Sequence, residues 1–314
     1  MTTPLLKRKR VFAAKHEATP GTAETLTTAE AAFNAYDVVI QNETEKESRE
    51  GQGSFGMRAS VPGGYKGRIT FKHDASWDGT ATEPSWADVL LPGCGWVKNG
   101  QVFTPRTEAP GTNVKTLTMA TYIDGVRKLL RGCVGTFKLI CPTGKAAYFE
   151  FDFIGIFDSP TDTAIIAPTY PTASPLRFAS STTTWNSVQL SVENMTLDSG
   201  NTMILREDPS DVSGYRCGLI TNRVVKITGN PESRLVATNP VHAKFFDMSE
   251  HELTWSLDGP TNSVLTFTAP KAEITSAPSE EERERMVVDA IEWQANRNGS
   301  TADQELSITF TAAT

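Results

Sequence analysis

The segment that decides the fold reads Tyr148-Phe149-Glu150-Phe151-Asp152-Phe153. Its phenylalanines alternate with polar residues, so on an extended strand the three rings lie on one face and the carboxylates of Glu150 and Asp152 on the other. Such alternation is typical of an antiparallel sheet with one buried and one solvated face. The segment therefore predicts a half-buried strand that carries Glu150 and Asp152 on its wet side.

The same alternation recurs along the chain. It is found at residues 68–73, 137–141, 188–193, 253–258 and 305–310. Turn sequences such as Asp124-Gly125 and Pro142-Thr143-Gly144 separate these runs. Together with 23 glycines and 18 prolines, the pattern predicts a mainly β protein of many short strands.

Two short helices are predicted within this β pattern, over residues 83–93 and 239–247. Pro84 and Pro240 fall where the first helical residue would lie, a position at which the missing N–H of proline costs nothing. Asn239 is a suitable N-cap for the second helix. The charged run at 279–285 fits two structures, a helix start with a capping box or the tip of a charged hairpin.

The chain has the pattern of an internal duplication. Pro240 lies 156 residues after Pro84, and the same offset places Phe246 on Leu90 and a strand around residue 227 on one around residue 71. Residues 161–184 are rich in proline, serine and threonine, a composition typical of a linker. We therefore predict two similar β domains at residues 1–160 and 185–314. Chance similarity between two β domains is the alternative.

Each predicted domain contains a long loop, at residues 42–65 and 193–221. Loops of this length are uncommon in compact domains and are usually functional or ordered by a partner. The first loop contains Gly51-Gln52-Gly53-Ser54-Phe55-Gly56, which has the spacing of a dinucleotide-binding motif. A charged run precedes it and no helix pattern follows, so we expect a loop without a nucleotide.

Composition and motifs argue against several functional classes. The chain has 314 residues and a formal net charge of −7, which disfavours tight sequence-independent binding of DNA. No apolar run approaches the ~20 residues of a membrane span, and no secretory leader is recognised. The four cysteines lack metal-like spacing and are expected to be reduced. The basic cluster at residues 7–10 is interpreted as a solvated flank.

No catalytic signature was found either, and we expect no enzyme activity, cofactor or metal. The four histidines are scattered and form no metal motif. Glu150 and Asp152 lie close enough to serve glycoside hydrolysis, but an acidic solvent face is the simpler interpretation.

Several segments resemble the major tail tube proteins of long-tailed bacteriophages of the non-contractile (siphovirus) type, over nearly the whole chain. The resemblance lies in residues 7–22, 84–95, 122–137 and 153–162. The last of these, Phe153-Ile154-Gly155-Ile156-Phe157-Asp158-Ser159-Pro160-Thr161-Asp162, is similar to a structural motif of such proteins. The acidic run at residues 280–284 and the insert at 208–211 depart from the family pattern.

The resemblance implies a fold and a structural role in the virion tail. Each domain would be a tail-tube-type β-sandwich or half-barrel with one helix and a long loop, and rings of such units would stack into a channel for DNA. Two units per chain would give three chains per ring, a pseudo-hexamer; one unit per chain would need six. Assembly would take place in the bacterial cytoplasm, without a membrane.

The resemblance also implies partners. They are neighbouring rings, the tape measure, terminator and distal tail proteins, and phage DNA in transient, non-specific contact. Glu150 and Asp152 are candidates for the channel face, and the exterior of the tube is the equally simple alternative for them. The first long loop is the candidate contact between rings, through Glu45, Lys46, Glu47, Arg49, Gly51, Gly53 and Phe55.

Two other functions remain open at the level of sequence. A carbohydrate-binding or carbohydrate-active β-sandwich would need an exposed aromatic platform, for which the chain has six tryptophans. A capsid protein would normally show a longer helix pattern than this sequence contains.

Overall fold

A computed structural model describes residues 4–53, 55–80, 82–260, 263–300 and 302–312. The protein is mainly β, and its strand pairings are antiparallel. The alternation at residues 148–153 has the predicted consequence: Phe149, Phe151 and Phe153 are buried, and their rings stack 5.6–6.1 Å apart. Glu150 and Asp152 lie on the opposite, solvated face.

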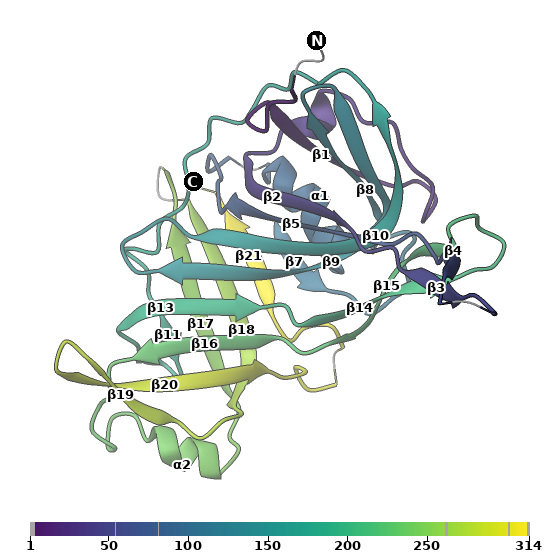
Figure 1. The fold of residues 1–314 in the computed structure, drawn as a ribbon. Coiled ribbons are helices and arrows are strands. Elements are labelled where there is room, and N and C mark those ends of the chain that lie inside the picture. Colours follow the sequence, from purple (N-terminus) through teal and green to yellow (C-terminus); the bar gives the residue numbers. More distant parts are fainter. Residues whose placement is uncertain (1–3, 54, 81, 261–262, 301, 313–314) are drawn as a thin grey trace.

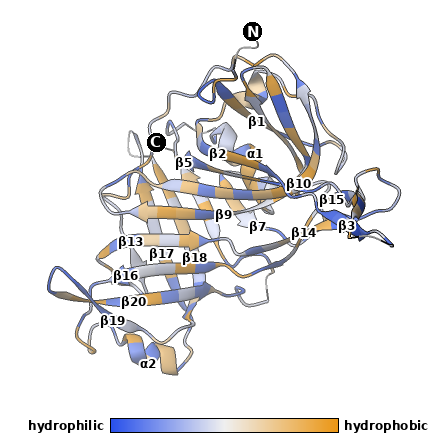
Figure 2. Ribbon diagram, in the orientation of Figure 1, coloured by the Kyte–Doolittle hydropathy of each residue, from blue (hydrophilic) through white to orange (hydrophobic). Residues whose placement is uncertain are grey.

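One large sheet runs through the whole molecule (Figure 1). Apolar and polar residues alternate along its strands, as the colours in Figure 2 show. The buried apolar residues form its inner face and the polar residues its outer face. We call it the main sheet. In spatial order its strands are β2 (Ala35–Asn42), β5 (Gly67–Asp74), β10 (Tyr148–Asp162), β9 (Val126–Pro142), β13 (Val192–Asp198), β16 (Lys226–Pro231), β20 (Met286–Ala295) and β19 (Ser279–Arg283).

The remaining strands form a second layer and two hairpins. Strand β9 pairs at its start with β8 (Leu117–Ile123), and β8 pairs with β1 (Arg10–His16). The hairpins are β3 (Lys46–Glu50) with β4 (Met57–Pro62), and β14 (Asn201–Glu207) with β15 (Tyr215–Arg223). The rest of the second layer comprises β12 (Val188–Gln189), β11 (Thr184–Trp185), β17 (His251–Asp258), β18 (Val264–Ile274), β21 (Ser307–Thr311), β7 (Val102–Pro105) and β6 (Trp96–Asn99).

Both predicted helices are present, as α1 (Ser85–Gly93) and α2 (Val241–Phe246). Pro84 and Pro240 are the N-cap residues, so the cap of α2 is Pro240 and not Asn239. The charged run at 279–285 is a hairpin, because Glu284 and Arg285 both adopt positive φ values in the turn between β19 and β20. Of the two structures left open by the sequence, the hairpin tip is the one observed.

Two sequence expectations need correction. The long loops at 42–65 and 193–221 consist largely of strands: the first is the β3–β4 hairpin, and the second includes main-sheet strand β13 as well as the β14–β15 hairpin. The single strand predicted at 188–193 is divided into β12 and the start of β13. Local alternation does not reveal such a break, because it depends on pairing with distant strands.

The two halves of the chain have the same scheme of strand pairing. We call β1–β10 with α1 the first half, and β11–β21 with α2 the second half. The first half pairs β1–β8, β8–β9, β9–β10, β10–β5, β5–β2 and β3–β4. The second pairs, in the same order, β11–β17, β17–β18, β18–β20, β20–β16, β16–β13 and β14–β15.

The correspondence extends to single residues. In the pairing of β8 with β9, the two-residue step from Leu117 to Met119 lies opposite a three-residue step on β9. The same irregularity recurs in the pairing of β17 with β18, where the step from His251 to Leu253 lies opposite three residues of β18. An ion pair of Arg68 with Asp152 joins β5 to β10, and Lys226 with Glu292 joins β16 to β20. The ion pairs align β5 with β16 at an offset of 158 residues, two more than the sequence offset of the helices.

The halves are fused into one body rather than tethered. Strand β13 pairs with the second part of β9, and β21 pairs with β7. One cluster of buried apolar residues runs through both halves. In the segment predicted as a linker, Leu176 and Phe178 are buried, so its later part is packed against the domains that it connects.

A buried carboxylate fixes the N-terminal segment to this framework. Glu17 is 3% exposed and accepts hydrogen bonds from the backbone N–H groups of Gly21 and Gly132 and from the hydroxyls of Thr116 and Thr118, at 2.7–2.9 Å. Both glycines have positive φ values, at +83° and +61°. Glu17 therefore links the loop after β1 to β8 and to the irregular part of β9.

Candidate assembly surface

The outer face of the main sheet is polar and charge-balanced. Glu150 lies 3.1 Å from the ammonium of Lys72, and Asp152 accepts two hydrogen bonds from the Arg68 guanidinium. Ion pairs of the same kind continue along the face, with Lys138–Asp198 at 3.0 Å and Lys226–Glu292 at 2.9 Å. The predicted wet face of Glu150 and Asp152 is confirmed, but each carboxylate is neutralised by a cation on a neighbouring strand.

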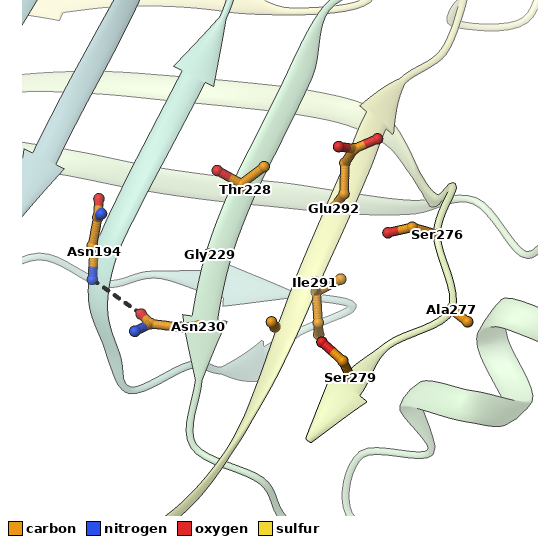
Figure 3. Close-up of a pocket in the computed structure, with 10 residues that line it drawn as sticks. Asn194, Thr228, Gly229, Asn230, Ser276, Ala277, Ser279, Ile291 and Glu292 are labelled. Carbon is orange, nitrogen blue, oxygen red and sulfur yellow. Dashed lines mark hydrogen bonds between the residues drawn. The ribbon is translucent and has the colours of Figure 1, made fainter. Parts of the chain in front are cut away.

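A shallow hollow on the second half belongs to the same face. Figure 3 shows it between β13, β16, β20 and the segment that leads into β19. Its lining is made of small polar groups, including Asn194, Thr228 and Glu292, and the backbone N–H of Asn194 donates to Asn230 Oδ1 at 3.2 Å. The hollow combines neither a nucleophile with a base nor a cluster of metal ligands.

The main sheet ends in two open edges. At one end β2 pairs with β5 only, and at the other β19 pairs with β20 only, among the residues that the structure describes. The five residues of β19 are exposed or nearly so. A strand whose N–H and C=O groups point outward unpaired is a template for another strand. These edges are therefore the main candidates for contacts with another chain.

The two hairpins project from the same side of the sheet, on the right in Figure 1. Every residue of β3 and β4 is exposed. The predicted contact residues lie on or beside this hairpin: Glu45, Lys46, Glu47, Arg49, Gly51, Gly53 and Phe55. Gly51 donates its N–H to the carbonyl of Gly56 at 3.1 Å, so the glycine-rich motif closes a hairpin tip and does not precede a helix.

The β14–β15 hairpin, by contrast, is packed across the first half. Arg131 on β9 binds Asp211 at 3.0 Å, and this hydrogen bond lowers the pKa of Asp211 to about 2. The amide of Asn201 donates to the carbonyls of Cys94 and Gly135 at 2.8 and 2.9 Å. The sequence showed both hairpins as long polar segments, but only the structure shows that one of them is used to join the two halves.

The tryptophans and cysteines, which the sequence offered for carbohydrate binding and for metal or thiol chemistry, lie inside the protein. All six tryptophans are buried, at 0–3% exposure, so they form no platform on the surface. The four cysteines are free and buried, and burial raises the pKa of each thiol. The described part of the chain contains no group of three or more potential metal ligands. In that part, no helix has the length and apolar character needed to span a membrane.

The comparisons with known proteins give a result that covers almost the entire chain. A family model described as phage tail tube protein matches residues 7–312. No curated protein matches the sequence.

Proposed function

The chain belongs to the phage tail tube protein family and is a structural protein of the tail tube; from this premise we propose that three copies close into each ring of a tube through which DNA passes. We further propose that the tail is of the long, non-contractile type. In this arrangement rings contact neighbouring rings, and the tape measure, terminator and distal tail proteins contact the tube from within or at its ends. Assembly takes place in the bacterial cytoplasm.

The proposed number of chains per ring rests on the repeated pairing scheme. Both halves have the same six pairings, the same irregularity at the start of β8 and of β17, and equivalent ion pairs. We therefore propose that residues 1–160 and 185–314 are two copies of one tube unit, joined through 161–184. Three chains then supply six units, and closing the ring removes the open sheet edges.

The outer face of the main sheet is the proposed channel wall, with Glu150 and Asp152 on it. Because each carboxylate is paired with Arg68 or Lys72, the wall presents little net charge. A protein gains free energy on binding DNA mainly when its unpaired lysine and arginine side chains replace the counterions of the phosphates. A wall whose lysines and arginines are already paired gives little of that gain, which suits a channel that DNA must leave.

Electron microscopy of the purified protein tests the ring and its symmetry. We expect hollow tubes or rings in which six similar units repeat, with three chains per ring, and with β5 and β10 facing the channel. A chain that stays monomeric at high concentration would overturn the proposal. Rings of six chains would retain the tube and exclude the three-chain ring.

The β3–β4 hairpin is the proposed contact between stacked rings. Its residues are exposed, and Phe55 is fully so, whereas the corresponding β14–β15 hairpin is anchored on a neighbouring half. A hairpin whose residues are all exposed can bury them only against a partner.

Deleting residues 45–56 tests this contact. We expect the variant to fold with an unchanged circular dichroism spectrum and to form single rings that do not stack. Loss of the rings themselves would place the hairpin between neighbours of the same ring instead. Tubes of normal length would show that the hairpin has no role in assembly.

The carbohydrate function is the alternative, and the residues that the sequence offered for it do not support it. It needs exposed aromatic side chains beside a carboxylate pair. The tryptophans are buried, and Glu150 and Asp152 are each bound to a cation.

A further inference from the structure

We propose that the acidic strand β19 of one chain pairs with strand β2 of the next chain, and that the basic residues 7–10 beside β2 select this partner. The inference rests on the proposed ring and names the surfaces that close it. It gives a role to two features that the sequence analysis left outside the function: the basic cluster near the N-terminus and the acidic run at 280–284.

The seam between the two halves provides the template. Strand β13 is the first strand of the second half's part of the main sheet, and it pairs with the last part of β9 from Asn194 opposite Pro142 to Asp198 opposite Lys138. The ion pair of Lys138 with Asp198 crosses this seam at 3.0 Å. The seam thus joins two units of the same kind, side by side, within one chain.

Strand β2 holds the place of β13 in the first half. Each is the outer neighbour of the strand that carries the ion-pairing base, β5 with Arg68 and β16 with Lys226. Gln41 lies opposite Arg68, and Asp198 opposite Lys226. Gln41 is therefore the equivalent of Asp198, but its strand has no further partner among the described residues.

Strand β19 holds the place of the last part of β9. Both pair with the strand that carries the ion-pairing acid, β10 with Asp152 and β20 with Glu292. Lys138 lies opposite Glu150, which is two residues before Asp152. Ser279 lies opposite Ala290, which is two residues before Glu292. Ser279 is therefore the equivalent of Lys138. Within the chain Asp198 lies opposite Lys138. The same register between two chains would therefore place Gln41 of one chain opposite Ser279 of the next.

The charged groups around the two open edges differ in sign, although β2 itself contains one acid, Asp37. Strand β19 presents Glu280, Glu281 and Glu282, all exposed. The guanidinium of Arg10 donates to the carbonyl of Val38 in β2, so the basic segment, whose residues 6–9 are held at Asp124 in the β8–β9 turn, ends next to that strand. Lys7, Arg8 and Lys9 are exposed in the same segment, and Lys9 contacts Asp124 at 3.2 Å.

The charge also distinguishes the two seams. Within the chain the base is on β9 and the acid on β13, whereas between chains the acid would be on β19 and the base beside β2. An acidic β19 edge meeting Asp198 on a β13 edge would be repelled, as like charges at an interface are. This reversal favours head-to-tail closure of whole chains over exchange of halves.

Charge reversal in the full-length chain tests the pairing. We expect E280K/E281K/E282K to raise the protein concentration for half-maximal ring assembly by about tenfold or more, and K7E/R8E/R10E to do the same. A chain that carries both sets of changes should recover assembly, because every seam again joins opposite charges. The control E207K/E252K changes exposed acids on β14 and β17, outside both edge strands and the basic segment, and should assemble as the parent does. Circular dichroism and thermal melting verify that each variant is folded.

A disulfide trap tests the register independently of charge. Q41C/S279C should form a covalent ladder of chains on mild oxidation of assembled rings, since opposed residues of antiparallel strands have Cβ atoms about 4.5–5.5 Å apart. The out-of-register control Q41C/E282C should not. The four native cysteines are buried.

The outcomes separate this inference from the proposed function. If the parent chain forms no rings, the proposed function fails. If the parent forms rings while the charge variants assemble unchanged and Q41C/S279C stays uncrosslinked, the tube stands and the β2–β19 seam is wrong. Loss of assembly in both reversals without recovery in the combined chain would also overturn the selection by charge.

Discussion

His73 shows how burial in the main sheet determines the chemistry of one residue. It lies on the inner face of β5 with Ile69 and Phe71, at every second position, and is 2% exposed. Its ring lies 5.4 Å from that of Trp86, and Nδ1 contacts the carbonyl of Asp74 at 2.6 Å. Burial lowers the pKa of His73 to about 4, so the imidazole is neutral at pH 7 and donates to that carbonyl.

This burial predicts a pH dependence of stability. Between about pH 6.5, the ordinary pKa of histidine, and about pH 4, the unfolded chain binds a proton at His73 that the folded chain does not. The free energy of unfolding therefore falls as the pH falls through this window, by up to about 1.4 kcal/mol per unit from this residue. Urea denaturation at several pH values measures the slope.

The variant His73→Leu isolates that contribution. It keeps an apolar side chain in the same place and has no titratable group, so the slope between pH 6.5 and 4 should become smaller than in the parent. The carboxylates and the other three histidines titrate in both proteins and cancel in the comparison. Equal slopes would show that His73 is not the responsible group.

At the scale of the element, α1 and α2 have the same position in the two halves but different surroundings. Leu90 in α1 is fully buried, whereas its equivalent Phe246 at the end of α2 is 73% exposed. Leu235, Val236 and Met248 beside α2 are also exposed. In Figure 1, α2 lies next to β19 and β20, at the open end of the second half. Such a patch marks a contact surface in a soluble chain.

The variant Phe246→Ser tests whether this patch is covered on assembly. We expect the melting temperature of the unassembled chain to change little, because an exposed ring contributes less than about 0.5 kcal/mol to folding. Assembly, measured by sedimentation, should weaken, because the phenyl side chain of Phe246 would no longer contact the next chain. The corresponding change Leu90→Ser, in the buried helix, should instead impair folding itself. Unaltered assembly of Phe246→Ser would exclude α2 from the interface.

At the scale of the whole molecule, the last strand joins the two halves. Phe310 on β21 is fully buried and packs 5.2 Å from Trp77, 5.9 Å from Phe103 and 6.3 Å from Trp86. All three aromatic partners belong to the first half. The core is therefore shared, and the chain is expected to unfold in one cooperative transition, as single domains do.

The variant Phe310→Ala should reduce the stability of both halves together. Truncation of a buried phenylalanine costs about 3–5 kcal/mol, which calorimetry or urea denaturation would detect. Phe55→Ala removes the same atoms from a fully exposed site and should leave the unfolding transition unchanged. Two separate transitions in the parent protein would show that the halves are independent domains.

The sequence by itself determined the local properties of this protein. Alternation at residues such as Phe149 and Phe151 identified the strands and their buried faces, because a two-residue period is a property of the extended backbone alone. Pro84 and Pro240 located the helices to within two residues for the same local reason. The paired motifs around the two helices also predicted a repeated unit, and Glu150 and Asp152 were placed correctly on the wet face.

Only the tertiary structure decided how these elements meet. It showed that Glu150 and Asp152 are bound by Lys72 and Arg68, that β13 belongs to the main sheet, and that β2 and β19 are its ends. Several partners across the sheet are far apart in the sequence, as Arg68 and Asp152 are by 84 residues, and their choice depends on packing and pairing free energies that no local pattern contains. The open edges, and hence the surfaces proposed for assembly, could therefore be found only after the chain was folded.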